Sequence, residues 1–192
     1  MVRTTNYLII AYIIMLMVVL ILPFYSSESY SIILNTTSQL GAQQTPNAWI
    51  MNLTFVLLGL GSILSGWKIL KGYTFHRVVL VLFGLSLVLA AIFHHAPVNT
   101  NLEYDLQQDW LHSVFASATG FSFTVFALSV TFIVEKKIDG LLAISAGILA
   151  MAFSMLMFNI PELMGIWQRL LFISCFGWLI YLFSNADKLK KR

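Results

Sequence analysis

Three of the four histidines and one aspartate lie close together in the middle of the chain. His94 and His95 are adjacent, and His112 follows after a short loop. Asp109 precedes His112 by three residues, a spacing that places both side chains on one face of a helix, about 5–6 Å apart. Imidazole and carboxylate groups are ligands of Zn²⁺, which in catalytic sites keeps an open position for water. The cluster therefore predicts a zinc site with the three histidines as ligands and Asp109 as a further ligand or a general base.

Two other interpretations of the same residues stay open. At the level of the lipid headgroups, the histidines would bond to water, lipid phosphate or Asp109 without holding a metal. A pair formed by His112 with His94 or His95 would instead suit b-type haem. Adjacent helical residues point about 100° apart, so both His94 and His95 reach His112 only if their helix unwinds at its end. Pro97 favours that unwinding.

A second group of polar residues lies near the same face. Arg169 stands seven residues inside an apolar run, where an unpaired cation costs about 2.5 kcal/mol or more. Glu162 or Asp109 would be its partner, or its side chain would extend to the headgroups. The functional interpretation is that Arg169, with Glu162 and Asn52, binds the phosphate or carboxylate headgroup of a substrate. Ser38, in a long polar loop, would fold over the site as a catalytic residue.

The elements that position these residues are six apolar runs. Hydrophobic residues make up 59% of the 192 and charged ones 10%, and the mean hydropathy is +0.85. Lipid must therefore be the solvent for most of the surface, and continuous rather than alternating runs favour helices over a barrel. We expect an all-α, polytopic membrane protein of one domain. Its six transmembrane helices are predicted at 6–24, 47–70, 74–95, 108–134, 138–159 and 162–183.

The charges orient these spans. Ten of the eleven basic residues fall on one side of a six-span alternation, namely Arg3, Lys68, Lys71, Arg77, Lys136, Lys137, Lys188, Lys190, Lys191 and Arg192. The positive-inside rule makes that side cytoplasmic, which predicts two cytoplasmic termini in the cell membrane and an outward-facing histidine cluster. No basic stripe interleaved with aromatic residues lies outside the apolar runs, so no nucleic-acid partner is expected.

Several residues have simpler interpretations. Cys175 lies in the middle of an apolar run, so it is predicted to pack in the core and to form no disulfide. His76, between basic residues, is predicted to be solvated in a loop. Asn47 is the expected N-cap of the second span.

Small residues recur at helical spacing in two of the spans. They extend from Gly59 to Gly66 in the second span and include Ser113, Ser117 and Gly120 in the fourth. Such stripes predict close helix packing in lipid.

Two phrases of the sequence resemble a known family. SQLGAQQTPNAWIMN, leading into a glycine-rich span, and DWLHSVFA, opening the fourth span, are similar to the bacterial and archaeal six-helix membrane proteins grouped as domain of unknown function 998. This resemblance implies six helices and brings no activity. A weaker likeness is to the alkaline ceramidase and adiponectin-receptor hydrolases, which combine three histidines, an aspartate and a serine around zinc. That group, however, has seven helices and a histidine pair spaced by three residues rather than adjacent.

Two functions follow as hypotheses. The first is a zinc-dependent hydrolase of a lipid or other amphiphile, in which metal-bound water is the nucleophile. The second is a non-catalytic membrane protein that binds a lipid or small molecule, since no strict catalytic motif is present. Membrane lipids are the expected partners in both cases. Transport is less well supported, because no polar residues continue through the middle of the membrane.

Overall fold

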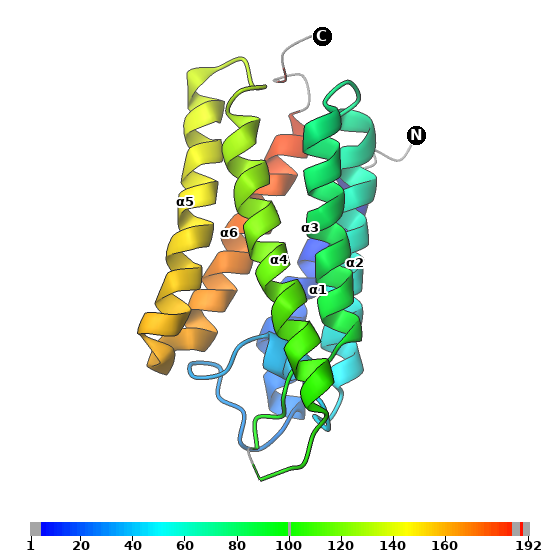
Figure 1. The fold of residues 1–192 in the computed structure, drawn as a ribbon, viewed down its shortest axis with the longest axis vertical. Helices are drawn as coiled ribbons and strands as arrows, with labels where there is room; N and C mark the ends of the chain where they lie inside the picture. The colour runs from blue at the N-terminus through cyan, green and yellow to red at the C-terminus, as the bar shows by residue number, and fades with distance from the viewer. Residues whose placement is uncertain (1–4, 100, 186–188, 190–192) are drawn as a thin grey trace.

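The computed structural model describes residues 5–99, 101–185 and 189. Within them, six long helices follow one another along the chain (Figure 1). They are α1 (Thr5–Ile21), α2 (Ala48–Ile69), α3 (Thr74–Ile92), α4 (Leu106–Val130), α5 (Lys137–Asn159) and α6 (Met164–Ser184). The short 3₁₀ turns are η1 (Leu22–Tyr25), η2 (Ser38–Gly41) and η3 (Pro161–Leu163). The described part of the chain contains no β-strand, so the all-α prediction is confirmed.

All six helices are long and apolar enough to cross a membrane. Large apolar side chains remain exposed on the outside of the bundle, including Phe121 (74% exposed), Phe132 (76%) and Phe158 (86%). Such surfaces are expected where lipid is the solvent. Two predicted spans are too long at their C-terminal ends, because α3 leaves helical geometry after Ile92 and α4 ends in tight turns after Val130.

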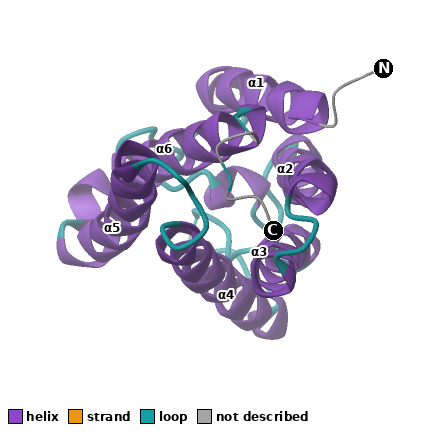
Figure 2. Cartoon of the chain, turned by 90° about the horizontal axis from the view of Figure 1, so that it is seen from above, coloured by secondary structure: helices purple, strands orange, loops and turns teal. Residues whose placement is uncertain are grey.

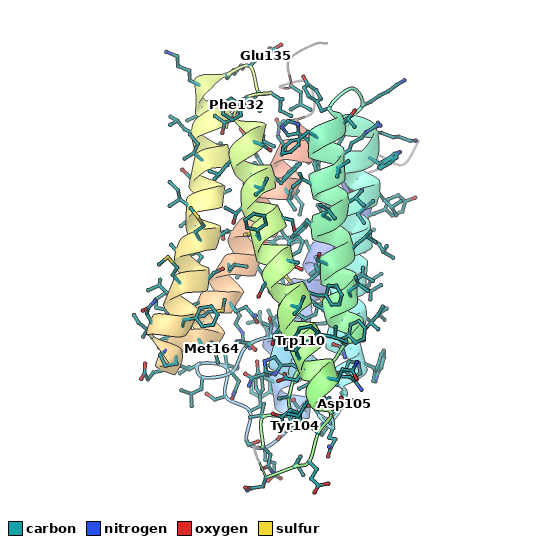
Figure 3. All side chains as sticks on the ribbon, in the orientation of Figure 1. Tyr104, Asp105, Trp110, Phe132, Glu135 and Met164 are labelled. Atoms are coloured by element: carbon teal, nitrogen blue, oxygen red, sulfur yellow. The ribbon has the colours of Figure 1, made fainter. Side chains whose placement is uncertain are left out.

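The helices pack as a ring of antiparallel neighbours. Each helix lies beside the next one in the chain, and α6 also contacts α1 and α2, while α5 stands at one edge (Figure 2). We call the end where α1 begins and α6 ends the terminal end, marked by Phe132 and Glu135 (Figure 3). The opposite, long-loop end carries the first long loop (residues 26–47) and the second long loop (residues 93–105), with Tyr104 and Asp105 (Figure 3).

Phenylalanine rings fill the centre of the bundle. The ring of Phe83 on α3 lies 5.6 Å from that of Phe123 on α4 and 5.9 Å from that of Phe176 on α6, measured between centroids. Tilted and edge-on contacts of this kind stabilise aromatic pairs beyond the area they bury. Cys175, also on α6, is 3% exposed, which confirms the prediction that it packs in the core.

His76 is buried, so the prediction of a solvated loop residue is wrong. It belongs to the first turn of α3 and is 8% exposed. Its Nε2 lies 3.1 Å from the carbonyl oxygen of Ser129, which can only accept, so Nε2 donates. The rings of Tyr73, Phe75 and Phe126 surround the imidazole edge-on. The neighbouring basic residues suggested a loop, but the helix has already begun at this position.

Small residues bring α2 and α3 into close contact but do not do so on α4. A Cβ added to Gly59 would lie 2.5 Å from the backbone oxygen of Gly84, and one added to Gly84 would lie 2.6 Å from that of Gly59. The predicted seam on α4 is wrong, because Ser113 and Ser117 are exposed. A Cβ on Gly120 would meet nothing within 4 Å. Toward the long-loop end α4 and α5 diverge (Figure 1).

We expect Gly84→Ala to lower the free energy of unfolding by about 1–3 kcal/mol, because the new methyl group must push two helix backbones apart. Gly120→Ala is the matched control, since it meets open space and replaces a helical glycine by a better helix former. It should leave stability unchanged or raise it by up to about 1 kcal/mol. Titration with SDS in mixed micelles measures both, and equal effects of the two variants would contradict the glycine contact.

Candidate functional site

His112 on α4 donates hydrogen bonds to the carbonyl oxygens at the end of α3. Its Nδ1 lies 2.7 Å from the carbonyl oxygen of Ala90 and 2.9 Å from that of Phe93. Carbonyl oxygens only accept, so Nδ1 carries the proton and donates to both. The last carbonyls of a helix have no partner within the helix, and in lipid each one left unpaired is costly. The imidazole, only 4% exposed, therefore holds α4 against the end of α3.

Asp109, one turn before His112, binds the chain that continues from α3. Its Oδ1 accepts a hydrogen bond of 2.7 Å from the backbone N–H of Ala96 and lies 3.6 Å from Nδ1 of His95. The rings of His95 and His112 meet nearly edge-on, with 5.1 Å between centroids. The backbone is extended at Phe93, so the expected unwinding of α3 is what lets His95 reach His112.

His94 does not join this group. Among the described residues it has no side-chain hydrogen bond or ring contact, and its backbone carbonyl accepts from Nε2 of Gln43 at 3.1 Å. The structure thus brings together His95, His112 and Asp109 of the four residues that were expected to form one site. Within the part of the chain that the structure describes, no three His, Cys, Asp or Glu side chains are arranged to hold a metal ion.

The donor set of this site is smaller than the predicted one, because it contains two imidazoles and one carboxylate but not His94. Nδ1 of His95 and Nδ1 of His112 face backbone carbonyls, and no hydrogen bond to either Nε2 is found in the described region. Fixing one ring nitrogen in this way is typical of metal-bound histidines. Only two imidazoles are offered, however, and Oδ1 of Asp109 already holds a backbone N–H. Catalytic zinc commonly takes three protein ligands, and two histidines with one carboxylate are one of the known sets, so zinc binding here stays a prediction.

Ser38 belongs to a separate polar cluster, formed by the first long loop and α6. Oε1 of Gln168 accepts from the backbone N–H of Thr37 at 2.7 Å and from its hydroxyl at 2.6 Å. Nε2 of Gln168 lies 3.5 Å from the hydroxyl oxygen of Ser38. Among the described residues no contact joins Ser38 to the histidines, so the predicted catalytic serine instead helps to fix the loop.

Arg169 fixes the same loop more strongly. The residue is 8% exposed. Nη1 donates to the carbonyl oxygens of Ile32 at 2.9 Å and Asn35 at 3.2 Å, and also to that of Gly165 at 2.9 Å. Nη2 donates to the hydroxyl oxygen of Tyr30 at 2.8 Å. The cation therefore does not extend to the headgroups, because backbone carbonyls of the loop solvate it inside the protein.

No counter-charge accompanies this cation in the described region. Glu162 is exposed on η3, and no carboxylate lies within 4.0 Å of Arg169 there. Burial raises the pKa of Tyr30, while Arg169 beside it acts in the opposite direction. The phenol thus stays neutral and supplies only its dipole. The predicted partnership of Arg169 with Glu162 or Asp109 is not found.

Asn52 faces protein, as predicted, and its side chain binds the first long loop. Its Nδ2 donates to the carbonyl oxygen of Gly41 at 3.0 Å, and a Cβ on Gly41 would collide with its amide. Asn47 is the N-cap residue of α2, as predicted, but its side chain makes no capping hydrogen bond. Its backbone is left-handed (φ 59°), and its Nδ2 donates to the carbonyl oxygen of Tyr25 at 2.8 Å.

Gln43 joins the two long loops, and sequence reasoning missed it. Its backbone N–H donates to the carbonyl oxygen of His95 at 2.9 Å. Its side-chain amide donates to the carbonyl oxygen of Asp105 at 3.0 Å and accepts from the N–H of the same residue at 2.8 Å. Asp105 in turn caps α4, and its hydrogen bonds with Gln108 lower the pKa of its carboxyl. The long-loop end is therefore one connected polar layer.

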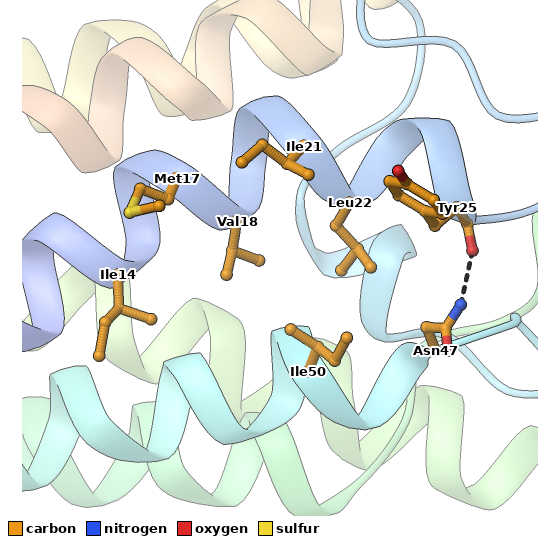
Figure 4. Close-up of a pocket in the computed structure, with 8 residues that line it drawn as sticks. All are labelled: Ile14, Met17, Val18, Ile21, Leu22, Tyr25, Asn47 and Ile50. Atoms are coloured by element: carbon orange, nitrogen blue, oxygen red, sulfur yellow. Dashed lines mark hydrogen bonds between the residues drawn. The ribbon is translucent and has the colours of Figure 1, made fainter.

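An apolar groove opens beside this layer, between α1 and α2. Its volume is about 510 Å³, and it is lined by Ile14, Met17, Val18, Ile21, Leu22, Tyr25, Asn47 and Ile50. Figure 4 shows Val18 of α1 and Leu22 of η1 facing Ile50 of α2, with Tyr25 and Asn47 at one end. Near the terminal end the two helices touch, since a Cβ on Gly61 would lie 3.3 Å from the Cα of Leu8. The groove is thus apolar along the two helices and polar at one end. We call this polar end, formed by Tyr25 and Asn47, the mouth.

A ring of six helices with lipid-facing apolar surfaces and a polar layer at one end defines a multi-pass membrane protein. The chain belongs to the family described as "Protein of unknown function (DUF998)", whose model matches residues 9–185. The resemblance of the sequence to domain of unknown function 998 is thereby confirmed. The chain matches no curated protein and no solved structure.

Proposed function

We propose that this protein is a non-catalytic membrane protein that binds one chain of a lipid in the groove between α1 and α2. The proposal rests on the presence of this groove. Its volume of about 510 Å³ falls within the range of ligand pockets, about 300–1,000 Å³. The polar side chains that a lipid hydrolase would need, such as Ser38 and Arg169, are instead occupied in holding the loops.

The dimensions of the groove suit a chain from one leaflet. From Ile14 to Leu22 the helix rises about 12 Å at 1.5 Å per residue. The hydrocarbon core of a bilayer is about 30 Å thick, so one leaflet contributes about 15 Å. Tyr25 and Asn47 then stand at the headgroup level, with the apolar lining below them. An amphiphile has the same order of polar and apolar parts.

The positions of the basic residues support a groove that faces outward. Lys68, Lys71 and Arg77 lie around the α2–α3 connection, and Lys136 and Lys137 at the α4–α5 connection, all at the terminal end. By the positive-inside rule this end faces the cytoplasm, with both termini, and the groove opens in the outer leaflet of the cell membrane.

A zinc-dependent hydrolase of an amphiphile is the second candidate. The observation that favours it is the contact of His95 with His112 and Asp109, with both Nδ1 atoms fixed. It is less well supported because only two imidazoles are brought together.

The groove is tested by filling it. After purification in maltoside detergent, we expect native mass spectrometry to find one lipid retained per chain. Val18→Phe places a ring inside the groove and should reduce retention at least tenfold, about 1.4 kcal/mol. Leu20→Phe is the matched control on the lipid-facing side of α1, where the side chain is 63% exposed, and should retain lipid normally. Equal retention by both variants, or none by the wild type, would refute the proposal.

Metal content separates the two candidates. We expect elemental analysis of the purified protein to find well under one zinc per chain, unchanged in His112→Asn, because no three His, Cys, Asp or Glu side chains among the described residues are arranged to hold a metal ion. Stoichiometric zinc in the wild type that disappears in His112→Asn would favour the hydrolase instead.

A further inference from the structure

The mouth of the lipid groove offers polar atoms that are not used within the protein. Nδ2 of Asn47 donates to the backbone oxygen of Tyr25 at 2.8 Å. In the described part of the chain no hydrogen bond is found to the amide oxygen of Asn47 or to the hydroxyl of Tyr25. Both residues are exposed, Tyr25 to 65%. A headgroup at this level would therefore meet a phenol ring and an amide oxygen, which is a hydrogen-bond acceptor.

The charges around the mouth have one sign. Glu28 is exposed three residues after Tyr25. Glu103 is exposed on the second long loop, and its backbone oxygen accepts from the side chain of Gln44, three residues before Asn47. Neither long loop contains a lysine or an arginine. The one cation of the neighbouring α6, Arg169, is buried under loop carbonyls.

Such a mouth favours one class of headgroup. Carboxylates repel a lipid phosphate that carries no compensating cation, and salt weakens this repulsion strongly only beyond the Debye length, about 8 Å at physiological salt. An ammonium group is attracted by the same carboxylates and by the face of an exposed tyrosine ring. The amide oxygen of Asn47 carries a partial negative charge, so it attracts an ammonium group, and it cannot donate a hydrogen bond to a phosphate.

Resting on the proposed lipid-binding function, we propose that the groove selects lipids whose headgroup carries an ammonium group and no net negative charge. Tyr25 and Glu28 would contact the ammonium, and the groove would take one chain below it. Anionic headgroups of the same chain length would be rejected.

The experiment compares two lipids with identical chains. Delipidated full-length protein in maltoside micelles is titrated with dioleoylphosphatidylcholine or dioleoylphosphatidylglycerol at low ionic strength, and bound lipid is counted by native mass spectrometry. We expect phosphatidylcholine to bind at least tenfold more tightly. In Glu28→Gln the preference should fall to about threefold or less, with the affinity for phosphatidylglycerol increased. Glu162→Gln, on the far connection between α5 and α6, should keep the full preference.

Each outcome decides a separate claim. Equal affinity for both lipids, lost for both in Val18→Phe, would overturn the headgroup selection and leave the groove as the binding site. An unchanged preference in Glu28→Gln would also overturn the selection. Binding of either lipid that Val18→Phe does not reduce would instead refute the proposed function itself.

Discussion

Replacing Arg169 by methionine should weaken the attachment of the first long loop to α6. The guanidinium donates to the backbone oxygens of Ile32 and Asn35 and to the hydroxyl of Tyr30. Hydrogen bonds to charged groups contribute about 1.5–3 kcal/mol each, and they are not additive. We therefore expect the loop to lose about 3 kcal/mol or more of local stability, a factor of about 100 in its opening equilibrium. Hydrogen exchange of the amides around residues 30–36 in micelles measures this directly.

Two further variants make this result specific. Gly165→Ala should produce the same loosening without touching the charge, because its methyl group would collide with the carbonyl oxygens of Ile32 and Asn35. Glu162→Gln, exposed at the start of the same segment, should leave exchange unchanged. Slow exchange that persists in Arg169→Met would show that the loop is held by other contacts.

Replacing His112 by leucine should destabilise the whole bundle by about 2–4 kcal/mol. The change keeps an apolar body but leaves the carbonyl oxygens of Ala90 and Phe93 without their donor. Each buried acceptor left unsatisfied costs about 1–3 kcal/mol. The free energy of unfolding in SDS titrations measures the loss. His94→Leu is the matched control, because no side-chain hydrogen bond of His94 is found among the described residues.

The variant His112→Asn distinguishes a structural role of the imidazole from a role in metal binding. The amide nitrogen of asparagine is bonded to Cγ, as Nδ1 is in histidine, so His112→Asn keeps a donor for the α3 carbonyls and removes Nε2. We expect it to restore at least half of the stability that His112→Leu loses. If His112→Asn is as unstable as His112→Leu while His112→Gln is not, the Nε2 side of the ring is the important one and the capping role is contradicted.

The six spans could be predicted because lipid leaves few alternatives. Continuous apolar runs of about 20 residues must be helical when no water is present to pair the backbone. Helix ends were less predictable, since they depend on contacts between segments. The end of α3 is the clearest case: Pro97 indicated that the helix would unwind, but not that it stops at Ile92, where His112 binds its last carbonyl oxygens.

The candidate site was predicted only in part, because residue spacing determines which side chains share a helix face but not which loop atoms they contact. The spacing of Asp109 and His112 fixes a shared helix face, and the structure confirms that both reach the end of α3. Sequence spacing contains no information on which loop atoms a side chain meets. Arg169 therefore suggested a headgroup clamp, whereas the carbonyls of the first long loop surround it. Gln43 gave no chemical signal at all, because a loop glutamine resembles any solvated residue until its partners are known.

The groove was not predicted either, since its residues are ordinary lipid-facing apolar side chains. It exists because α1 and α2 touch near Gly61 and separate toward Tyr25. That divergence depends on the size of side chains on two helices, which a one-dimensional pattern does not contain.

An experimental density map of the protein in lipid nanodiscs, at a resolution that shows side chains, tests lipid binding most directly. We expect one continuous tubular density between α1 and α2, running from Ile14 to a headgroup beside Tyr25. A groove closed by side chains, together with a compact peak bridging His95, His112 and Asp109, would contradict it.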